Sequence, residues 1–406
     1  PPFKIPEDLL NQWRNFYKRN KKIKEQWHKK NKTLINSVFF KKIFKNTLDP
    51  NLINLINKFK KKHIKEKTSC ATRKANELSL ELFNEKMDNL IGGSADLTGS
   101  NNTKPKSMTS FNVSNYNGNY LYYGVREHAM AAIINGISLH GGLRPYGGTF
   151  LVFTDYCRPS IRLSALMGLN SIFVMTHDSI GLGEDGPTHQ PVEHLASLRA
   201  IPNLSVVRPC DIIETVEAWQ IALESQNPTI LVLTRQNLPL IRNKKNKENL
   251  LEKGAYIIKN YEDYDASILA SGSEVEIACE ASEELKKNDL NVRVISVPCF
   301  EYFENQSDEY KKQILGNKNI GPLILQMKIL FLYSKFSFIL NSRRWTSQNS
   351  SEHTYGKFLQ RHFSEFEKFS RVYFSQHLIN AQRSIFWRSL GVFAFHDISA
   401  TQKRVP

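Results

Sequence analysis

Apolar runs and helix-like segments alternate through the middle of the chain. Ser171–Thr176 and Ile230–Thr234 are short, largely apolar runs of the kind found in strands that are buried on both faces. Lys74–Met87 and Glu127–Leu139 have the length and pattern of helices. This alternation predicts an α/β fold built on a parallel sheet.

A second strand–helix–strand unit follows the first region. Ala266–Ala270 and Asn291–Val297 have strand patterns, and the helix-like segment Ser273–Lys287 lies between them. From about Asn319 to the end, no convincing periodicity is present. The pattern therefore predicts two α/β regions and a tail without recognisable elements.

Polar residues gather where two of the predicted strands end. His177 directly follows Ser171–Thr176, and Arg235 directly follows Ile230–Thr234. Open parallel sheets bind ligands at the carboxyl ends of their strands, so these side chains are expected at a binding edge. The spacing alone leaves open a glycine-rich surface loop with two solvated histidines, His177 and His189.

The cysteines and the length narrow the class of protein. A chain of 406 residues is long enough for two domains with real cores. Its five cysteines are scattered and lack CxxC spacing, which argues against a disulfide framework or a zinc site. This usage favours a reducing compartment, and residues 1–25 show no apolar segment of a secretory signal, so a cytoplasmic location is predicted.

The excess of basic residues that gives the chain its net charge of +16 lies outside residues 71–340, which contain the predicted strands and helices. Residues 1–70 hold 19 Lys and Arg against 5 Asp and Glu, whereas residues 71–340 hold 26 against 30. The lysines near the start are interleaved with Asn and Ile, and no nucleic-acid-binding motif accompanies them. We therefore expect no nucleic-acid partner.

Five segments of the chain stand out: IGGSADLTGSN (Ile91–Asn101), YGVREHAMAAIINGISLHGG (Tyr123–Gly142), PYGGTF (Pro145–Phe150), THDSIGLGEDGPTHQP (Thr176–Pro191) and LTRQNLP (Leu233–Pro239). In these segments the chain closely resembles transketolases, the thiamine-diphosphate enzymes that move two-carbon units between sugars. The segments occur in the family's order and at close to its spacing. The resemblance implies an α/β fold, a parallel-sheet pyrimidine-binding domain followed by a partial α/β C-terminal domain that is distant from the chemistry.

The resemblance also implies a division into domains. Residues 1–70 resemble a basic helical connector between domains, residues 71–245 the pyrimidine-binding domain, and residues 246–318 part of the C-terminal domain. Residues 319–406 do not resemble the family, and a frameshift is the simplest hypothesis for them. Polar residues interrupt the apolar run Ile320–Leu340, so no membrane span is expected there.

Glu127 is the predicted catalytic carboxylate. A glutamate at a helix start is usually an ionised cap stabilised by the helix dipole, and from the pattern alone that role is favoured. In the family, the matching glutamate hydrogen-bonds the aminopyrimidine of thiamine diphosphate and activates the cofactor. That role needs a shielded carboxylate that can hold a proton near neutral pH.

Other residues are expected to hold the cofactor because of the same resemblance. Asp96 and Leu97 would lie against the thiamine, with Leu97 supporting its bent shape. Phe150, Phe153 and Tyr156 recur at three-residue spacing, which more often marks a core than a cofactor site. In the family this segment sandwiches the aminopyrimidine, and Phe153 would stack on the ring.

A third set of residues is expected to bind a phosphorylated sugar. Arg73 and Arg235 would clamp the phosphate, since a guanidinium can engage two of its oxygens. The resemblance places Ser100 and His189 at the same phosphate. Asp185 would bind a sugar hydroxyl, and His177 would handle protons at the reacting hydroxyls as a second catalytic residue.

The implied activity is transfer of a two-carbon ketol unit from a ketose phosphate to an aldose phosphate in the pentose phosphate pathway. The family's diphosphate-and-metal motif, GDG followed by an asparagine, is absent from the chain. The ligands of Mg²⁺ or Ca²⁺ are therefore expected on an N-terminal domain, and we expect a homodimer or a complex with a separate N-terminal half. A non-catalytic remnant, a dihydroxyacetone synthase-like enzyme and other thiamine enzymes are the alternatives; the segment from His177 to His189 speaks against the last.

Overall fold

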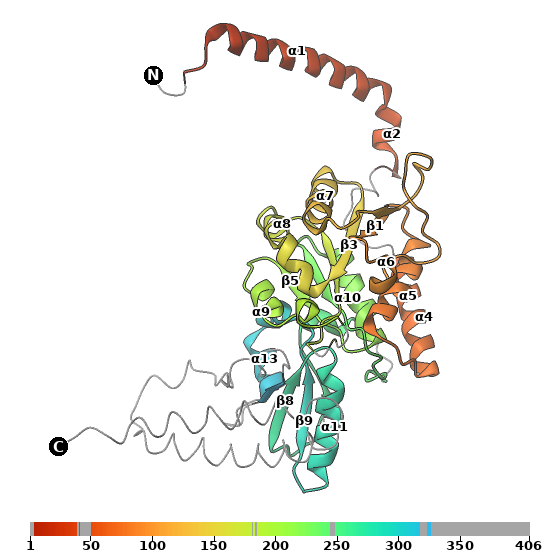
Figure 1. The fold of residues 1–406 in the computed structure, drawn as a ribbon, viewed down its shortest axis with the longest axis vertical. Coiled ribbons are helices and arrows are strands. Elements are labelled where there is room, and N and C mark those ends of the chain that lie inside the picture. The colour runs from red at the N-terminus through yellow and green to blue at the C-terminus, as the bar shows by residue number, and fades with distance from the viewer. Residues whose placement is uncertain are drawn as a thin grey trace, which may run out of the picture. The chain divides into compact units, whose positions relative to one another are not determined.

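Six parallel strands form the main sheet of this computed structural model, which describes residues 4–38, 40, 50–180, 182, 185–243, 248–316 and the backbone of 323–325. The strand order in space is β2-β1-β3-β4-β6-β5, and Figure 1 labels β1, β3 and β5 of this sheet. Every pairing in this sheet is parallel, so the carboxyl ends of all six strands lie at one edge. The strands are β1 (Leu90–Ser94), β2 (Tyr120–Tyr122), β3 (Arg144–Phe150), β4 (Ile172–Thr176), β5 (Ser205–Val207) and β6 (Thr229–Val232).

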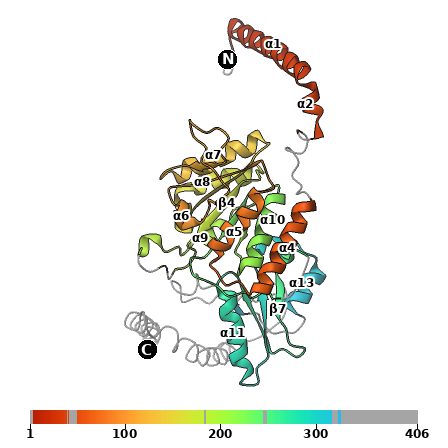
Figure 2. The ribbon, with the colours of Figure 1, turned by 90° about the vertical axis from the view of Figure 1, so that its right-hand side faces the viewer.

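Helices cover both faces of this sheet. On β4, Ile172 and Val174 pack into a core with one group of helices, and Phe173 and Met175 pack into a second core with the other group. Figure 2 shows β4 between the two groups. This alternation explains why the strand sequence is apolar throughout. The first group is α4 (Pro50–Glu66), α5 (Thr72–Asn84) and α10 (Ile212–Glu224), and the second is α7 (Glu127–His140), α8 (Thr154–Leu166) and α9 (His194–Arg199).

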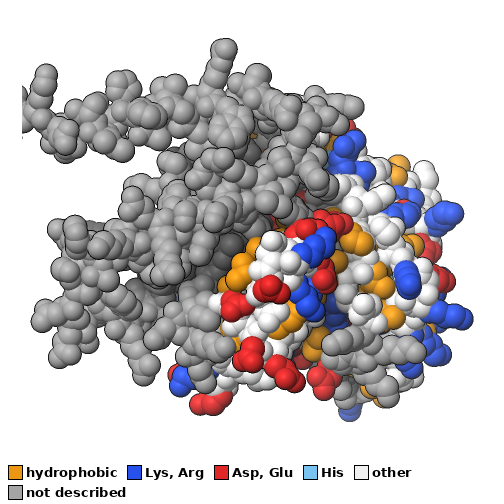
Figure 3. Space-filling view, turned by 90° about the horizontal axis from the view of Figure 1, so that it is seen from below, with side chains coloured by type: hydrophobic (Ala, Val, Ile, Leu, Met, Phe, Trp, Pro, Cys, Tyr) orange, Lys and Arg blue, Asp and Glu red, His pale blue; other side chains and the backbone are white. Residues whose placement is uncertain are grey.

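A smaller sheet follows, with the strand order β10-β8-β9-β7. Its strands β8, β9 and β10 pair in parallel, and β7 pairs antiparallel with β9. On the described part of the face seen in Figure 3, acidic and basic side chains lie side by side among apolar ones. The elements of this region are η3 (Leu250–Lys253), β7 (Tyr256–Lys259), β8 (Ala266–Ala270), α11 (Glu274–Lys286), β9 (Val292–Ser296), α12 (Phe300–Glu304), α13 (Asp308–Leu315) and β10 (Leu323–Leu325).

The chain before α4 is helical. Helix α1 (Glu7–Lys30) begins after Pro6 with two acidic residues in its first turn, as the PEDL sequence predicts, and none of its residues is buried. The short helix α2 (Lys32–Asn36) follows it. Among the described residues, no helix combines the length and the apolar character that a membrane crossing requires. The run Ile320–Leu340 lies outside the described residues, apart from the backbone of β10.

The α/β fold predicted from the sequence is confirmed, and its elements differ from prediction mainly at their ends. Strand β8 has the predicted bounds, whereas α5 is shifted by two to three residues from the predicted Lys74–Met87. The apolar pattern after Pro191 predicts a helix that begins at this proline, but α9 begins only at His194, and a 3₁₀ turn (η2, Pro187–His189) lies before Pro191. Helix α8 continues through Pro159.

Candidate active site

Residues after the main strands meet at the carboxyl edge of the sheet. His177 directly follows β4, and Phe150, the last residue of β3, pairs in register with Thr176. The backbone of His177 has a φ of 60°, in the left-handed region that residues other than glycine seldom adopt. The same φ occurs at Asp96, just after β1. The chain thus turns sharply at both strand ends.

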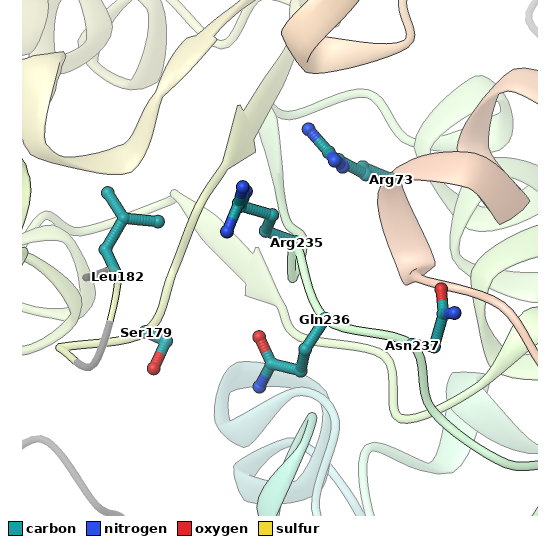
Figure 4. Close-up of a pocket in the computed structure, with 6 residues that line it drawn as sticks. All are labelled: Arg73, Ser179, Leu182, Arg235, Gln236 and Asn237. Carbon is teal, nitrogen blue, oxygen red and sulfur yellow. The ribbon is translucent and has the colours of Figure 1, made fainter. Parts of the chain in front are cut away.

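A pocket of about 460 Å³ opens at this edge, and two arginines line it (Figure 4). The side chain of Arg73 is held by a 2.7 Å hydrogen bond from Nη1 to the Ser100 carbonyl. Burial and the positive charge of Arg235 both lower the pKa of Arg73. Two guanidinium cations at one pocket favour an anion there. The pocket lining also includes Ser179, Leu182, Gln236 and Asn237.

His177 is a buried, neutral histidine beside these cations. Its side chain is only 3% exposed, and its ring stacks on Phe150 with centroids 3.8 Å apart. Burial, followed by the positive charges of Arg73 and Arg235, lowers the pKa of His177 to about 4. Asp185 is close enough to oppose this shift. The imidazole is therefore unprotonated at neutral pH and can accept a hydrogen bond.

The predicted aromatic residues form one continuous row. The rings of Phe150 and Phe153 are 5.6 Å apart and 6° from parallel, and those of Phe153 and Tyr156 are 5.7 Å apart and 24° from parallel. His189 meets Phe153 edge-on at 5.3 Å. Tyr156 is 62% exposed, so the row reaches from the core to the surface. Parallel aromatic faces of this kind suit contact with another flat ring.

Glu127 is the first residue of α7 and is only 8% exposed. Its charge contributes, after burial, to raising the pKa of Cys157 to about 12, which places the carboxylate beside α8. No side-chain cap hydrogen bond is made at this helix start. A shielded carboxylate at a helix N-terminus is suited to a hydrogen bond with a bound ligand.

The remaining predicted residues occupy different parts of this edge. Asp96 and Asp185 are exposed, and Leu97 is half-buried with its N–H donating to Ser94 at 3.2 Å. Ser100 contacts Arg73 through its carbonyl oxygen, a contact that the sequence did not suggest. The structure thus gathers Arg73, Ser100 and His177 directly and joins His189 to them through the aromatic row. Among the described residues, neither Asp96 nor Glu127 has a hydrogen bond or an ion pair with this group.

Sequence reasoning missed a buried ion cluster beside the site. Arg208, which follows β5, donates from Nε to Asp178 at 2.7 Å and from Nη2 to Glu274 at 3.0 Å. All three side chains are buried, and Asp178 is the residue next to His177. Glu274 is the first residue of α11, in the region that the sequence analysis expected to be distant from the chemistry. That expectation needs correction, because Glu274 of this region and Asp178, the residue next to His177, bind the same arginine, Arg208.

One group among the described residues has the spacing of a metal site. Donor atoms of Asp155, Glu193 and His194 lie within 4.8 Å of one another. However, His194 Nδ1 accepts the Val192 N–H at 3.2 Å, which puts the ring proton on Nε2. Nε2 lies 3.1 Å from Asp155 Oδ2, which is within ion-pair distance, but it makes no hydrogen bond to any described residue.

Comparison with known proteins identifies the two regions. Residues 68–241 match the family model "Transketolase, pyrimidine binding domain", and residues 254–337 match "Transketolase-like TK C-terminal domain". The second match extends past residue 318, where the sequence analysis ended this region, and it includes β10.

Individual relatives agree with the family models. The chain is 49% identical to a transketolase of Cereibacter sphaeroides over 320 residues, which cover 78% of this chain and 48% of the relative. It is 51% identical to a transketolase of Bacillus subtilis over 276 residues, or 66% of this chain and 41% of the relative. A Pichia stipitis transketolase variant solved with fructose 6-phosphate superposes with a TM-score of 0.72 at 37% identity, covering 80% of this chain and 49% of that one. The chain therefore spans about half the length of the curated relatives that it matches.

Proposed function

This chain belongs to the transketolase family, and from that membership we propose that it supplies the pyrimidine-binding half of a ketol-transferring enzyme. The reaction would move a two-carbon ketol unit from a ketose phosphate to an aldose phosphate, with thiamine diphosphate as cofactor. This is a reaction of the pentose phosphate pathway and would take place in the cytoplasm.

One observation carries the proposal: two arginines and a neutral histidine meet at the carboxyl edge of the sheet. Arg73 Nη1 lies 3.4 Å from His177 Nε2, and Arg235 shares the pocket with Arg73. A sugar phosphate has an anionic end that suits the guanidinium groups and hydroxyl groups that suit the imidazole. A site that bound only an inorganic anion would not need a buried neutral histidine.

The substrate roles follow from this arrangement. Arg73 and Arg235 bind the phosphate, and His189 together with Ser100 completes its binding site. Asp185 is exposed near His177 and binds a sugar hydroxyl. His177 handles the proton of a reacting hydroxyl, and its depressed pKa keeps the imidazole unprotonated at neutral pH.

The cofactor roles rest on the aromatic row and on Glu127. Phe153 stacks on the aminopyrimidine, Phe150 and Tyr156 extend that surface, and Asp96 and Leu97 lie against the thiamine. Glu127 hydrogen-bonds the aminopyrimidine nitrogen, and its low exposure shields that contact from water. Thiamine diphosphate, when bound, supplies the nucleophilic carbon and the electron sink.

A separate protein half is part of the proposal. The ligands of the diphosphate-bound Mg²⁺ or Ca²⁺ would come from an N-terminal, diphosphate-binding half in another polypeptide. The complete enzyme would be a complex of the two halves or a dimer of such complexes.

The test is a coupled ketol-transfer assay with xylulose 5-phosphate and ribose 5-phosphate, thiamine diphosphate and Mg²⁺. The chain is measured alone and after mixing with the part of the Cereibacter sphaeroides transketolase that it does not cover. We expect activity only in the mixture, and its loss in Glu127→Ala. Glu85→Ala, at an exposed glutamate after α5, is the matched control and should keep the activity.

The assay includes an internal standard. The same N-terminal part is also mixed with the C-terminal part of its own protein, which shows whether it is competent. If that pair is active while the mixture with this folded chain is not, the proposal is wrong and a non-catalytic remnant explains the chain. Activity that survives Glu127→Ala would remove the proposed role of Glu127.

A further inference from the structure

Four buried polar side chains form a row beneath the candidate site. Ser94 ends β1, Asn101 ends the short helix α6 (Thr98–Asn101), Thr176 ends β4, and His177 follows it. Ser94, Asn101 and Thr176 are fully buried, and His177 is only 3% exposed. The amide nitrogen of Asn101 lies 3.1 Å from Ser94 Oγ, and its amide oxygen lies 2.7 Å from Thr176 Oγ1. Thr176 Oγ1 in turn lies 2.8 Å from His177 Nδ1. Polar groups this deep are expected to be fully hydrogen-bonded.

The far end of the row fixes the direction of its hydrogen bonds. Ser94 Oγ lies 3.0 Å from the Gly148 carbonyl, which can only accept, and 3.2 Å from the Leu97 N–H, which can only donate. The single hydroxyl proton of Ser94 therefore goes to Gly148, and Ser94 must accept from the NH₂ group of Asn101. The carbonyl oxygen of Asn101 is left facing Thr176 and accepts its hydroxyl proton.

At the near end, the same sequence of donors and acceptors continues to His177. Thr176 has donated its only proton to Asn101, so His177 Nδ1 must donate to Thr176 Oγ1. At the other ring nitrogen, Arg73 Nη1 lies 3.4 Å from Nε2, and an arginine can only donate. Both neighbours of the ring thus require a proton on Nδ1 and a lone pair on Nε2.

We infer that Asn101 and Thr176 are positioning residues that hold His177 in its Nδ1–H tautomer, with the Nε2 lone pair on the side of Arg73. Neither residue contacts the pocket lining directly in this role; each acts through the imidazole. This inference rests on the proposed function for its consequence, which is that Nε2 accepts the hydrogen bond of Arg73 and so holds that guanidinium at the phosphate end of the pocket. A histidine in the other tautomer would present an N–H to the guanidinium and could not hold it.

The tautomer is measured directly by nitrogen-15 NMR of the histidine side chains in the full chain, with His177→Gln to assign the signal. We expect Nδ1 in the protonated range and Nε2 in the unprotonated range at pH 7. Thr176→Val, which removes the hydroxyl, should give a mixture of tautomers, whereas Thr176→Ser should restore the wild-type pattern. A wild-type signal from the Nε2–H tautomer would overturn the inference, even if no variant folded.

Kinetics in the complemented enzyme provide the second readout. Thr176→Val should raise the KM for the sugar phosphates about tenfold with a smaller change in kcat, and Thr176→Ser should be close to wild type. An unchanged tautomer in a folded Thr176→Val protein would also overturn the inference. Because the NMR measurement needs neither cofactor nor activity, a failure of the proposed ketol transfer leaves this test intact.

Discussion

Arg208 and Arg73 are found at the same edge of the six-stranded sheet, in opposite electrostatic surroundings. Arg208 is 1% exposed and is matched by two buried carboxylates, Asp178 and Glu274. Burial lowers the pKa of Arg208, but these carboxylates raise it more, so the pKa lies above its ordinary value. The pKa of Arg73 is lowered instead, by burial and then by the second cation, Arg235.

The difference separates a structural cluster from a binding site. Around Arg208 the charges are balanced by the protein itself, and removing one partner leaves the others buried and unpaired. Around Arg73, the described residues offer no ion-pair partner for either guanidinium, and a pocket lies beside them. An anion that enters this pocket completes a charge arrangement that the fold leaves unbalanced.

The largest effect is expected when the balanced cluster is broken. Arg208→Met should lower the free energy of unfolding by about 3–5 kcal/mol, because it leaves Asp178 and Glu274 buried without their cation. Urea denaturation of the full chain measures this. Arg73→Met is the comparison variant and should cost far less. Equal losses in the two variants would contradict the distinction between the two arginines.

A smaller effect is expected on binding when the unbalanced cluster is reduced. Arg235 is exposed, so Arg235→Met should change stability by less than about 0.5 kcal/mol. It should weaken the binding of ribose 5-phosphate about tenfold, which corresponds to about 1.4 kcal/mol, since one charge-assisted hydrogen bond is lost. Isothermal titration calorimetry measures the affinity.

Arg162→Met provides the control for this binding experiment, because Arg162 is an exposed arginine on α8 away from the pocket lining. Its affinity should equal that of the wild type. If Arg162→Met weakens binding as much as Arg235→Met does, the effect reflects net charge and the pocket is not the phosphate site.

The sequence predicted the position of a site residue where a single local pattern determines it. It did not predict contacts between residues that lie far apart in the chain. His177 and Arg235 could be placed because each directly follows an apolar strand pattern, and parallel strands share an edge. Arg208 also follows a strand, but its partners lie 30 and 66 residues away, so no local pattern reveals the cluster.

The hydrogen-bonded row below the site was hidden for the same reason. Thr176 and Asn101 are separated by 75 residues and meet only because β1, α6 and β4 pack together. Their polar side chains resemble ordinary turn and strand-end residues in the sequence. The direction of the hydrogen bonds, which assigns the tautomer of His177, depends on a backbone carbonyl and an arginine that only the folded chain brings there.

The smallest effect concerns the protonation of His177. This residue contacts Arg73 and is followed in the chain by Asp178, the partner of Arg208. Its pKa of about 4 in the folded chain lies below the ordinary 6.5, so the unfolded state binds more protons between these values. This histidine therefore contributes stability that is complete above about pH 6.5 and is lost as the pH falls towards 4. Between pH 7 and pH 5.5 the loss from this residue should be about 1 kcal/mol. His177→Gln should lack that part of the pH dependence, as measured by urea denaturation at both pH values.

NMR titration provides the sharper comparison: removing the cation in Arg73→Met should raise the pKa of His177, and Arg162→Met should leave it unchanged. A wild-type His177 that titrates near 6.5 would show that the positive surroundings of the pocket do not act on it.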